Sequence, residues 1–170
     1  MPIFRLEKGM NAHINIGEMT IEDYDEVTAL WQSVDGMGLG PSDSRDNIAR
    51  YLARNPGMSF AAREGHMLVG AVICGTDGRR GYLSHLAVRA SHRKQGVGKE
   101  LIGRCLAALH AVGIPRCNLF VFAVNAGAIA FWRKMGWQFW EERGVRGMSF
   151  DIDGKGVAAH TSKGVGNDHG

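Results

Sequence analysis

Hydrophobic residues recur at helical spacing soon after the N-terminal end of the chain. A short alternating stretch from Ile14 to Ile16 predicts a strand, and Thr20-Ile-Glu-Asp23 resembles a capping box that opens a helix. The apolar stripe of this helix consists of Tyr24, Val27, Leu30, Trp31 and Val34. The helix is expected to end near Asp35-Gly36.

A second helix is predicted to begin at the capping residues Ser42 and Asp43 and to run through Arg54. The sequence Asn55-Pro56-Gly57 stops it, because proline and glycine interrupt helical hydrogen bonding. The glycine-rich connection of residues 36–41 joins the two helices, and a flexible junction of this kind is a candidate wall for a substrate site.

Three strand-like runs follow, separated by the turn signals Glu64-Gly65 and Asp77-Gly78. The runs are Met58 to Arg63, Met67 to Cys74 and Tyr82 to Val88. Short turns between successive strands predict an antiparallel meander.

The pattern changes after Val88, where a basic loop from Arg89 to Gly98 opens a third helix that ends at Gly113 and Pro115. The apolar stripe of this helix is Leu101, Ile102, Cys105, Leu106 and Leu109. The elements predicted after it are a buried strand from Asn118 to Val124, a helix from Ala126 to Met135 capped by Asn125, and a closing hairpin of residues 137–141 and 147–152.

This organisation predicts one domain over residues 14–152, preceded by an N-terminal extension of residues 1–13. A chain of 170 residues with 45% hydrophobic content buries an adequate core without disulfides or metals. The glycine-rich, polar tail of residues 153–170 shows no periodicity and is expected to be disordered.

Composition narrows the function classes. The net charge of +3 is too small for a dedicated nucleic-acid binder, so no nucleic-acid partner is expected. The three cysteines form no C-x-x-C pair, and the histidines show no paired-ligand spacing, so no metal site is expected. The free thiols and the absence of a long apolar run predict a cytoplasmic protein with no membrane partner.

The segment from Leu86 to Gly98 combines a strand end, a cationic loop and a helix start, which together form an anion site. Gly96 and Gly98 lack a Cβ atom, so a diphosphate can approach the main chain, while Arg93 and Lys94 add positive charge. Neither G-x-G-x-x-G nor G-x-x-x-x-G-K-[ST] is present, so the usual dinucleotide and nucleoside triphosphate motifs do not fit.

This loop resembles the acyl-CoA motif [RQ]-x-x-G-x-[GA] of the GNAT superfamily of N-acetyltransferases, matched by Arg93, Gly96 and Gly98. The segment from Val124 to Trp137 resembles the second signature of that superfamily, roughly V-N-x-x-A-I-x-F-Y-x-K-x-G-F. The resemblance covers about Ile14 to Ile152. It implies an α/β (α+β) fold with a central mixed, mostly antiparallel sheet, splayed in the middle and flanked by about four helices.

The resemblance also implies acetyl-CoA as the acyl donor, bound in the gap between the strands that end at Val88 and Val124. Its pantetheine arm would pair with the main chain of Leu86, Ala87 and Val88 and contact Asn125. Its diphosphate would lie on Arg93, Lys94, Gln95, Gly96, Val97, Gly98 and Lys99.

The strand before the loop has no carboxylate, although members of the superfamily often place one there. We predict that Tyr82 or Ser84 holds a water that relays the proton. By strand alternation these two share a face, and His85 is expected on the other face, packed against a helix. Trp132 replaces the tyrosine that commonly protonates the leaving thiolate, and its indole N–H is a hydrogen-bond donor to sulfur.

Trp31 and Asp35 are candidates for contact with the acceptor, against the alternative that Trp31 is a core residue and Asp35 a turn residue. The function hypothesis is acetyl transfer to a primary amine of a small molecule or of a peptide or protein N-terminus. Two alternatives stay open, namely a non-catalytic acyl-CoA-binding module and a nucleotide-phosphate binder. Exposed edges of the closing hairpin are compatible with a homodimer.

Overall fold

The structure is a computed structural model that describes residues 14–140, 142 and 144. The chain divides into two compact units between Phe131 and Trp132, and each unit is considered by itself. The predicted extension of residues 1–13 and the tail of residues 153–170 lie outside the described residues, so the domain boundaries stay a prediction.

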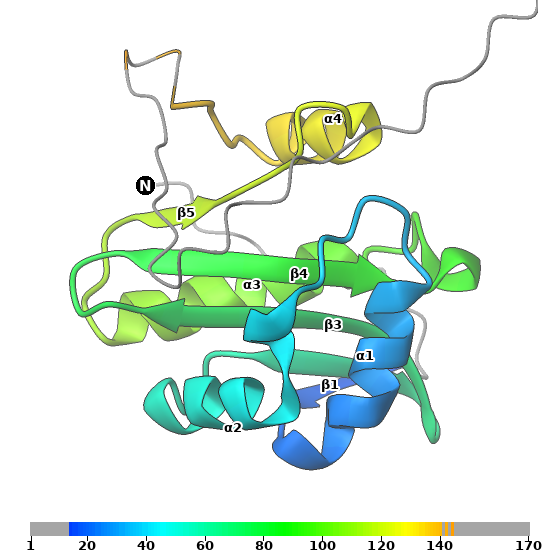
Figure 1. The fold of residues 1–170 in the computed structure, drawn as a ribbon. Coiled ribbons are helices and arrows are strands. Elements are labelled where there is room, and N and C mark those ends of the chain that lie inside the picture. The colour runs from blue at the N-terminus through cyan, green and yellow to red at the C-terminus, as the bar shows by residue number, and fades with distance from the viewer. Residues whose placement is uncertain (1–13, 141, 143, 145–170) are drawn as a thin grey trace, which may run out of the picture. The chain divides into compact units, whose positions relative to one another are not determined.

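A five-stranded mixed sheet forms the centre of the first unit, with its strands side by side in sequence order (Figure 1). The strands are β1 (Ile14–Glu18), β2 (Phe60–Glu64), β3 (Met67–Thr76), β4 (Gly81–Val88) and β5 (Cys117–Leu119). Neighbouring strands pair antiparallel, except that β4 and β5 are parallel. The predicted meander and the mixed, mostly antiparallel sheet are therefore confirmed.

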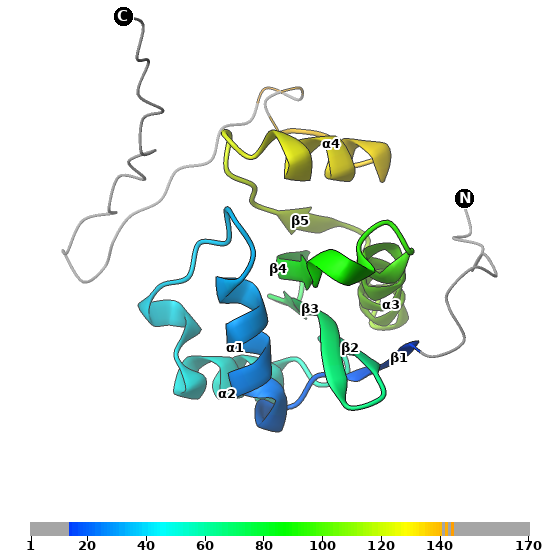
Figure 2. The same cartoon turned by 90° about the vertical axis from the view of Figure 1, so that its right-hand side faces the viewer.

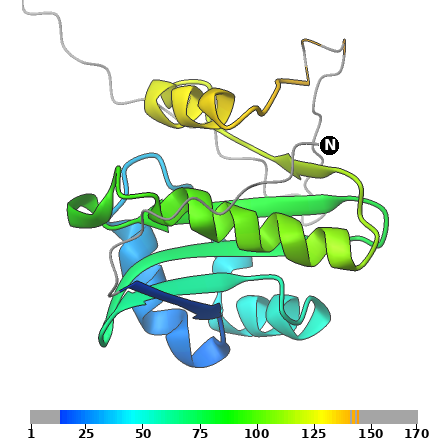
Figure 3. The same ribbon diagram turned by 180° about the vertical axis from the view of Figure 1, so that it is seen from behind.

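Helices cover both faces of this sheet. The described α-helices are α1 (Tyr24–Gln32), α2 (Arg45–Arg54), α3 (Val97–Ala111) and α4 (Ala126–Lys134), and the short 3-10 turns are η1 (Ile21–Asp23), η2 (Pro41–Asp43) and η3 (Ala90–His92). Helices α1 and α2 lie on one face, and α3 crosses the opposite face (Figures 2 and 3). None of the described helices is long and apolar enough to span a lipid bilayer.

The sheet opens between β4 and β5, as the family resemblance implied. The two strands pair only from Gly81 to Leu83 on β4, although β4 continues to Val88. The predicted buried strand from Asn118 to Val124 is wrong beyond Leu119, where β5 ends. Phe120 and Val124 are 76% and 80% exposed. An apolar run predicts a strand only if a partner strand is within reach, and here the partner diverges.

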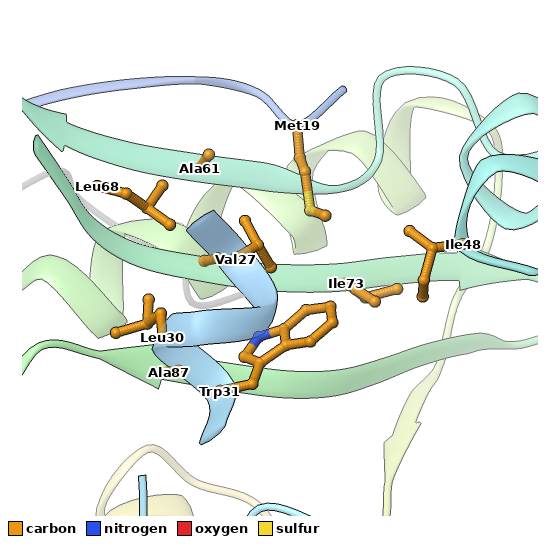
Figure 4. Close-up of a cluster of buried hydrophobic side chains, with 10 residues drawn as sticks. Met19, Val27, Leu30, Trp31, Ile48, Ala61, Leu68, Ile73 and Ala87 are labelled. Atoms are coloured by element: carbon orange, nitrogen blue, oxygen red, sulfur yellow. The ribbon is translucent and has the colours of Figure 1, made fainter. Parts of the chain in front are cut away.

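The main core lies between the sheet and α1. Val27, Leu30 and Trp31 of α1 are almost fully buried against Ile73 and Ala87 of the sheet (Figure 4). Burying a side chain of this size stabilises the fold by about 1.5–3 kcal/mol, so this cluster holds α1 firmly against β3 and β4. Trp31, at 1% exposure, is therefore a core residue.

The start of α1 follows the predicted capping chemistry. The Thr20 amide donates to Asp23 Oδ2 at 2.9 Å, and η1 leads directly into α1. Asn125 also caps α4 as predicted, because its Oδ1 accepts from the Ala128 amide at 3.0 Å. The first arm of the predicted closing hairpin is not a strand over residues 137–140, and its second arm lies outside the described residues.

Among the residues that the structure describes, the buried hydroxyl of Thr28 in α1 has no hydrogen-bond partner. Replacing Thr28 with valine keeps the shape and removes the unsatisfied group, so we expect the free energy of unfolding to rise by about 1 kcal/mol in urea denaturation. Thr76→Val is the matched control, because the Thr76 hydroxyl donates to the Arg80 carbonyl and accepts from the Gly78 amide. This control is expected to lose about 1 kcal/mol, and equal effects of the two substitutions would contradict the argument.

Candidate active site

The loop between β4 and α3 presents main-chain donors at a helix N-terminus. Lys94 and Gly96 adopt positive φ angles of 60° and 85°, and these two left-handed residues turn the chain into α3. The first hydrogen bond of the helix is donated by Glu100 to the Gly96 carbonyl at 3.0 Å. Val97 and Gly98 come before Glu100 in the chain, so their amides have no acceptor inside the helix. These two amides are therefore suited to bind an anion.

The cationic loop is anchored at several points. Arg93 Nε donates to the Val88 carbonyl at 3.0 Å, and Gln95 Nε2 donates to the Ser91 carbonyl at 2.9 Å. His92 is 8% exposed, with Nδ1 2.8 Å from Ser91 Oγ and Nε2 3.0 Å from Glu64 Oε2. His92 therefore ties the loop to the end of β2.

The edge of β4 that faces the opening is the second part of the site. Beyond Leu83, β4 has no strand partner on the β5 side in the described chain, so the main chain of Leu86, Ala87 and Val88 borders the gap. An extended ligand can pair with such an edge as an added strand. Leu86 and Val88 point toward α3, because a Cβ atom on Gly98 would lie 4.0 and 3.6 Å from their side chains.

A β-bulge interrupts β4 beside this edge. Ile73 pairs with Ser84 and Ala71 pairs with Ala87, so two residues of β4 lie opposite Val72 alone. His85 is the first of the two and has a φ angle of 51°, which is rare for a residue other than glycine. The bulge turns the His85 ring toward α1, where it contacts Trp31 with ring centroids 4.9 Å apart.

The prediction that His85 lies on the face opposite Ser84 is therefore wrong. Ser84 pairs with Ile73, which belongs to the core beneath α1, and His85 also contacts α1. Strand alternation assumes a regular ladder, and the extra residue of a bulge shifts the alternation by one position. Tyr82 and Ser84 share a face as predicted, because their partners Gly75 and Ile73 both face the α1 and α2 side.

Asp43 fixes the orientation of His85. Its Oδ1 lies 2.8 Å from His85 Nε2, and its Oδ2 accepts from the Gly40 amide at 2.8 Å. The Asp43 carbonyl accepts from the Tyr24 hydroxyl at 2.9 Å, which holds η2 against α1. Both partners are mostly shielded, with side chains 17% and 16% exposed for His85 and Asp43. Asp43 was predicted only as a helix cap, and no local signal links it to a residue 42 positions away.

Tyr82 and Ser84 occupy different environments. Tyr82 lies near the start of β4, and its hydroxyl is 3.4 Å from Asp77 Oδ2 at the β3–β4 turn. Hydrogen bonds from the Arg80 and Arg79 amides hold the pKa of the Asp77 carboxyl below its usual range. Ser84 is exposed and directly precedes the bulge. At about 3.3 Å per residue, Tyr82 is roughly 13 Å from Leu86 along the strand.

Two of the remaining candidates in the first unit, Asp35 and Asn125, lie around the junction that follows α1. Asp35 is exposed, and the glycine-rich connection of residues 36–41 approaches the segment after β5. A Cβ atom on Gly36 would be 2.6 Å from Asn125 Nδ2, and one on Gly38 would be 2.6 Å from Phe122 Cζ. In the second unit, Trp132 is half-buried and packs edge-on against Trp137, with ring centroids 5.2 Å apart.

The cysteines are poorly suited to act as nucleophiles. A hydrogen bond with Cys74, followed by burial, raises the pKa of the Cys105 thiol far above its usual value. Burial raises the pKa of Cys117 to about 12. Over the described residues, no group of three histidine, cysteine or acidic side chains is arranged to hold a metal ion.

Comparison with known proteins identifies the class of protein that this geometry defines. The model of the acetyltransferase (GNAT) family matches residues 24–137. An acetyltransferase of Sodalis glossinidius is 33% identical over 115 residues, which cover 67% of this chain and 80% of that protein.

Two solved structures share the fold. Ard1 of Thermoplasma volcanium superimposes with a TM-score of 0.65 at 20% identity, covering 74% of this chain and 82% of that one. The PaiA N-acetyltransferase of Thermoplasma acidophilum, solved in complex with coenzyme A, has a TM-score of 0.63 at 17% identity, with coverage of 72% and 87%.

The chain therefore belongs to the GNAT acetyltransferase family. It is an acyltransferase that uses acetyl-CoA as the acyl donor and an amine as the acceptor.

Proposed function

We propose that the protein transfers the acetyl group of acetyl-CoA to a primary amine of a small molecule or of a peptide N-terminus. The observation that carries this proposal is the juxtaposition of an open β4 edge with the amides at the start of α3. The pantetheine arm would pair with Leu86, Ala87 and Val88. The diphosphate would lie on the loop residues Arg93, Lys94, Gln95 and Gly96 and on the first residues of α3, Val97, Gly98 and Lys99.

Asn125 is proposed to contact the arm through its side-chain Nδ2, since Oδ1 already caps α4. Asp35 is exposed at the start of the glycine-rich connection and is proposed to contact the acceptor. Trp31 is buried, so its proposed influence on the acceptor passes through the ring of His85. Trp132 is proposed as a hydrogen-bond donor to the CoA sulfur.

Transfer by direct attack is the mechanism that these residues favour. Cys105 and Cys117 have raised pKa values and are not ready thiolates, which disfavours an acyl-enzyme intermediate. Holding both substrates together lowers the barrier through orientation, an effect worth roughly 7 kcal/mol when the geometry is good. A main-chain amide near the bulge would stabilise the developing oxyanion.

Binding of acetyl-CoA provides the first test. We expect acetyl-CoA at 100 times its dissociation constant to add about 2.7 kcal/mol to the stability, seen as a raised melting temperature. ATP and NAD at equal concentration are expected to protect less, because they lack the pantetheine arm that pairs with β4. Equal protection by ATP would favour a nucleotide-phosphate binder and contradict the proposal.

Release of free thiol from acetyl-CoA provides the second test. The acceptor panel consists of a polyamine, an aminoglycoside and short peptides with free α-amino groups, with N-acetylated peptides as controls. The measurement separates the small-molecule and peptide classes. Binding of acetyl-CoA without transfer to any of these amines would instead support a non-catalytic acyl-CoA-binding module.

The free thiols of Cys74, Cys105 and Cys117 suit a reducing compartment, and on this ground we place the protein in the cytoplasm. Nucleic acid and membrane are not among the proposed partners, because the small net charge provides no broad basic surface. A homodimer is the proposed assembly, to be tested by sedimentation.

A further inference from the structure

We propose that His85, held by Asp43, is the base that removes the proton from the acceptor amine. This inference rests on the proposed transfer to an amine and assigns the one step of that reaction for which a side chain is needed. Its basis is the β-bulge in β4, which brings an imidazole and a carboxylate together at the strand that borders the opening.

The backbone at His85 is built at an energetic cost. A φ angle of 51° is unfavourable for a residue other than glycine, and neither glycine nor asparagine occupies the position. Strain of this kind persists only where the surroundings determine it, and it is found most often at functional sites. As a result of this backbone conformation, the His85 ring lies on the α1 side of the sheet, where it contacts Trp31 and Asp43.

The hydrogen bond to Asp43 determines which ring nitrogen can accept a proton. A carboxylate oxygen 2.8 Å from Nε2 favours the tautomer that carries its hydrogen on Nε2. Nδ1 is then the basic nitrogen, and in the described part of the chain it has no hydrogen-bond partner. Asp43 Oδ2 is fixed by the Gly40 amide, so the carboxylate cannot turn away from the ring. Asp43 is therefore a positioning residue.

His85 is also closer to the proposed reaction centre than the other candidates. It directly precedes Leu86, where the main chain is proposed to meet the thioester end of the pantetheine arm. Tyr82 lies roughly 13 Å from Leu86 along the strand and donates toward the β3–β4 turn. Ser84 is adjacent to the bulge, but a hydroxyl is a much weaker base than an imidazole and can only position a water.

The proposed step moves two protons and one acetyl group. An ammonium group gives one proton to His85 Nδ1 and becomes a nucleophilic amine. Its nitrogen forms the C–N bond at the thioester carbonyl carbon, and the C–S bond breaks with its electron pair leaving on the CoA sulfur. The second proton shed by the nitrogen ends on that sulfur, and the proton on His85 returns to solvent.

The test compares acceptors that need the base to different degrees. A lysine-like ε-amine has a pKa of about 10.4 and an α-amine one of about 7.7–8.0, so the former depends more on the base at neutral pH. The probes are one peptide with a free α-amine and an N-acetylated peptide with one lysine, each with acetyl-CoA. His85→Asn is the main variant, because asparagine tolerates a positive φ angle and cannot act as the base. His85→Gln is the second variant.

We expect His85→Asn to lower kcat/KM for the lysine acceptor by about 10²–10⁴-fold near neutral pH, with a smaller loss for the α-amine. The loss should shrink as the pH is raised toward the pKa of the acceptor. Asp43→Asn is expected to lower kcat at least about tenfold and to change the pH profile, while KM for acetyl-CoA stays the same. The charged side chain in contact with the His85 ring is Asp43 of η2. The contact from α1 is Trp31, which is uncharged.

The exposed His66 at the β2–β3 turn provides the matched control, and His66→Asn is expected to keep full activity. Losses of equal size for both acceptors at every pH would overturn the role of His85 as the base, because a structural defect would affect all acceptors alike. Wild-type activity in His85→Asn, with loss in Ser84→Ala or Tyr82→Phe, would assign the step to the water relay instead. Absence of transfer by the wild-type protein would overturn the proposed function itself.

Discussion

Replacing Gly96 with aspartate is expected to weaken the binding of acetyl-CoA by at least about a hundredfold, equivalent to about 2.7 kcal/mol. A carboxylate at this position would lie beside the amides that we propose hold the diphosphate. Two unit charges about 4 Å apart interact with roughly 1 kcal/mol in bulk water and about 4 kcal/mol near a protein surface. Repulsion from the two phosphate groups therefore accounts for the expected loss. The measurement is titration calorimetry with CoA and acetyl-CoA.

The matched control is Gly96→Asn. Asparagine and aspartate have nearly the same shape, and both tolerate the positive φ angle of 85° found at Gly96. Apart from the two chain neighbours, no atom of the described residues lies within 4 Å of a Cβ atom at this position, so neither variant should disturb the fold. We expect Gly96→Asn to bind CoA at least about tenfold more tightly than Gly96→Asp.

A second control places the same new charge elsewhere on α3. Outside its own turn of helix, an added Cβ atom on Gly103 also meets no atom of the described residues within 4 Å, and Gly103 lies about two turns beyond the loop. Gly103→Asp is expected to leave the affinity for CoA unchanged at moderate salt, because screening is strong beyond about 10 Å. Equal affinity of wild type and Gly96→Asp would show that the diphosphate lies elsewhere.

The elements that sequence reasoning predicted well are those specified by short-range chemistry. The capping box at Thr20, the cap at Asn125 and the turn into α3 at Gly96 each depend on residues within four positions of one another. Apolar periodicity located α1 and α3 for the same reason. A loop that binds an anion through its own amides is likewise a local feature, which is why its motif is readable in the sequence.

The features that the sequence did not reveal depend on distant contacts. Val72 faces two residues of β4, and nothing in the stretch from Tyr82 to Val88 signals that a bulge interrupts it. The contact between His85 and Asp43 joins residues 42 positions apart. The length of β5 depends on whether β4 stays within hydrogen-bonding distance, and β5 pairs with β4 only at residues Gly81 to Leu83.

Gly81 lies where β4 and β5 meet, and its contact with α3 can be tested by substitution. Gly81 pairs with Cys117 and its amide donates to the Arg116 carbonyl at 2.8 Å, while Leu109 of α3 packs beneath it. A Cβ atom on Gly81 would lie 2.4 Å from Leu109 Cδ1, and Leu109 is only 2% exposed. The absence of a side chain at Gly81 therefore lets α3 approach the strands closely.

Leu109→Ala is expected to lower the free energy of unfolding by about 3 kcal/mol, because it leaves a cavity beneath this junction. Leu106→Ala, on the same helix but half-buried, should cost about 1 kcal/mol. Gly81→Ala alone is expected to cost about 2 kcal/mol through overpacking against the leucine.

In the double variant Gly81→Ala with Leu109→Ala, the added methyl group enters the space that the leucine vacates. The double variant should therefore be more stable than the sum of the two single losses predicts, by about 1–2 kcal/mol. Urea denaturation measures the free energies of unfolding of the wild type, the two single variants and the double variant on one scale, provided that their m-values are equal. Strictly additive losses would contradict the argument that an alanine side chain at position 81 and Leu109 compete for this space.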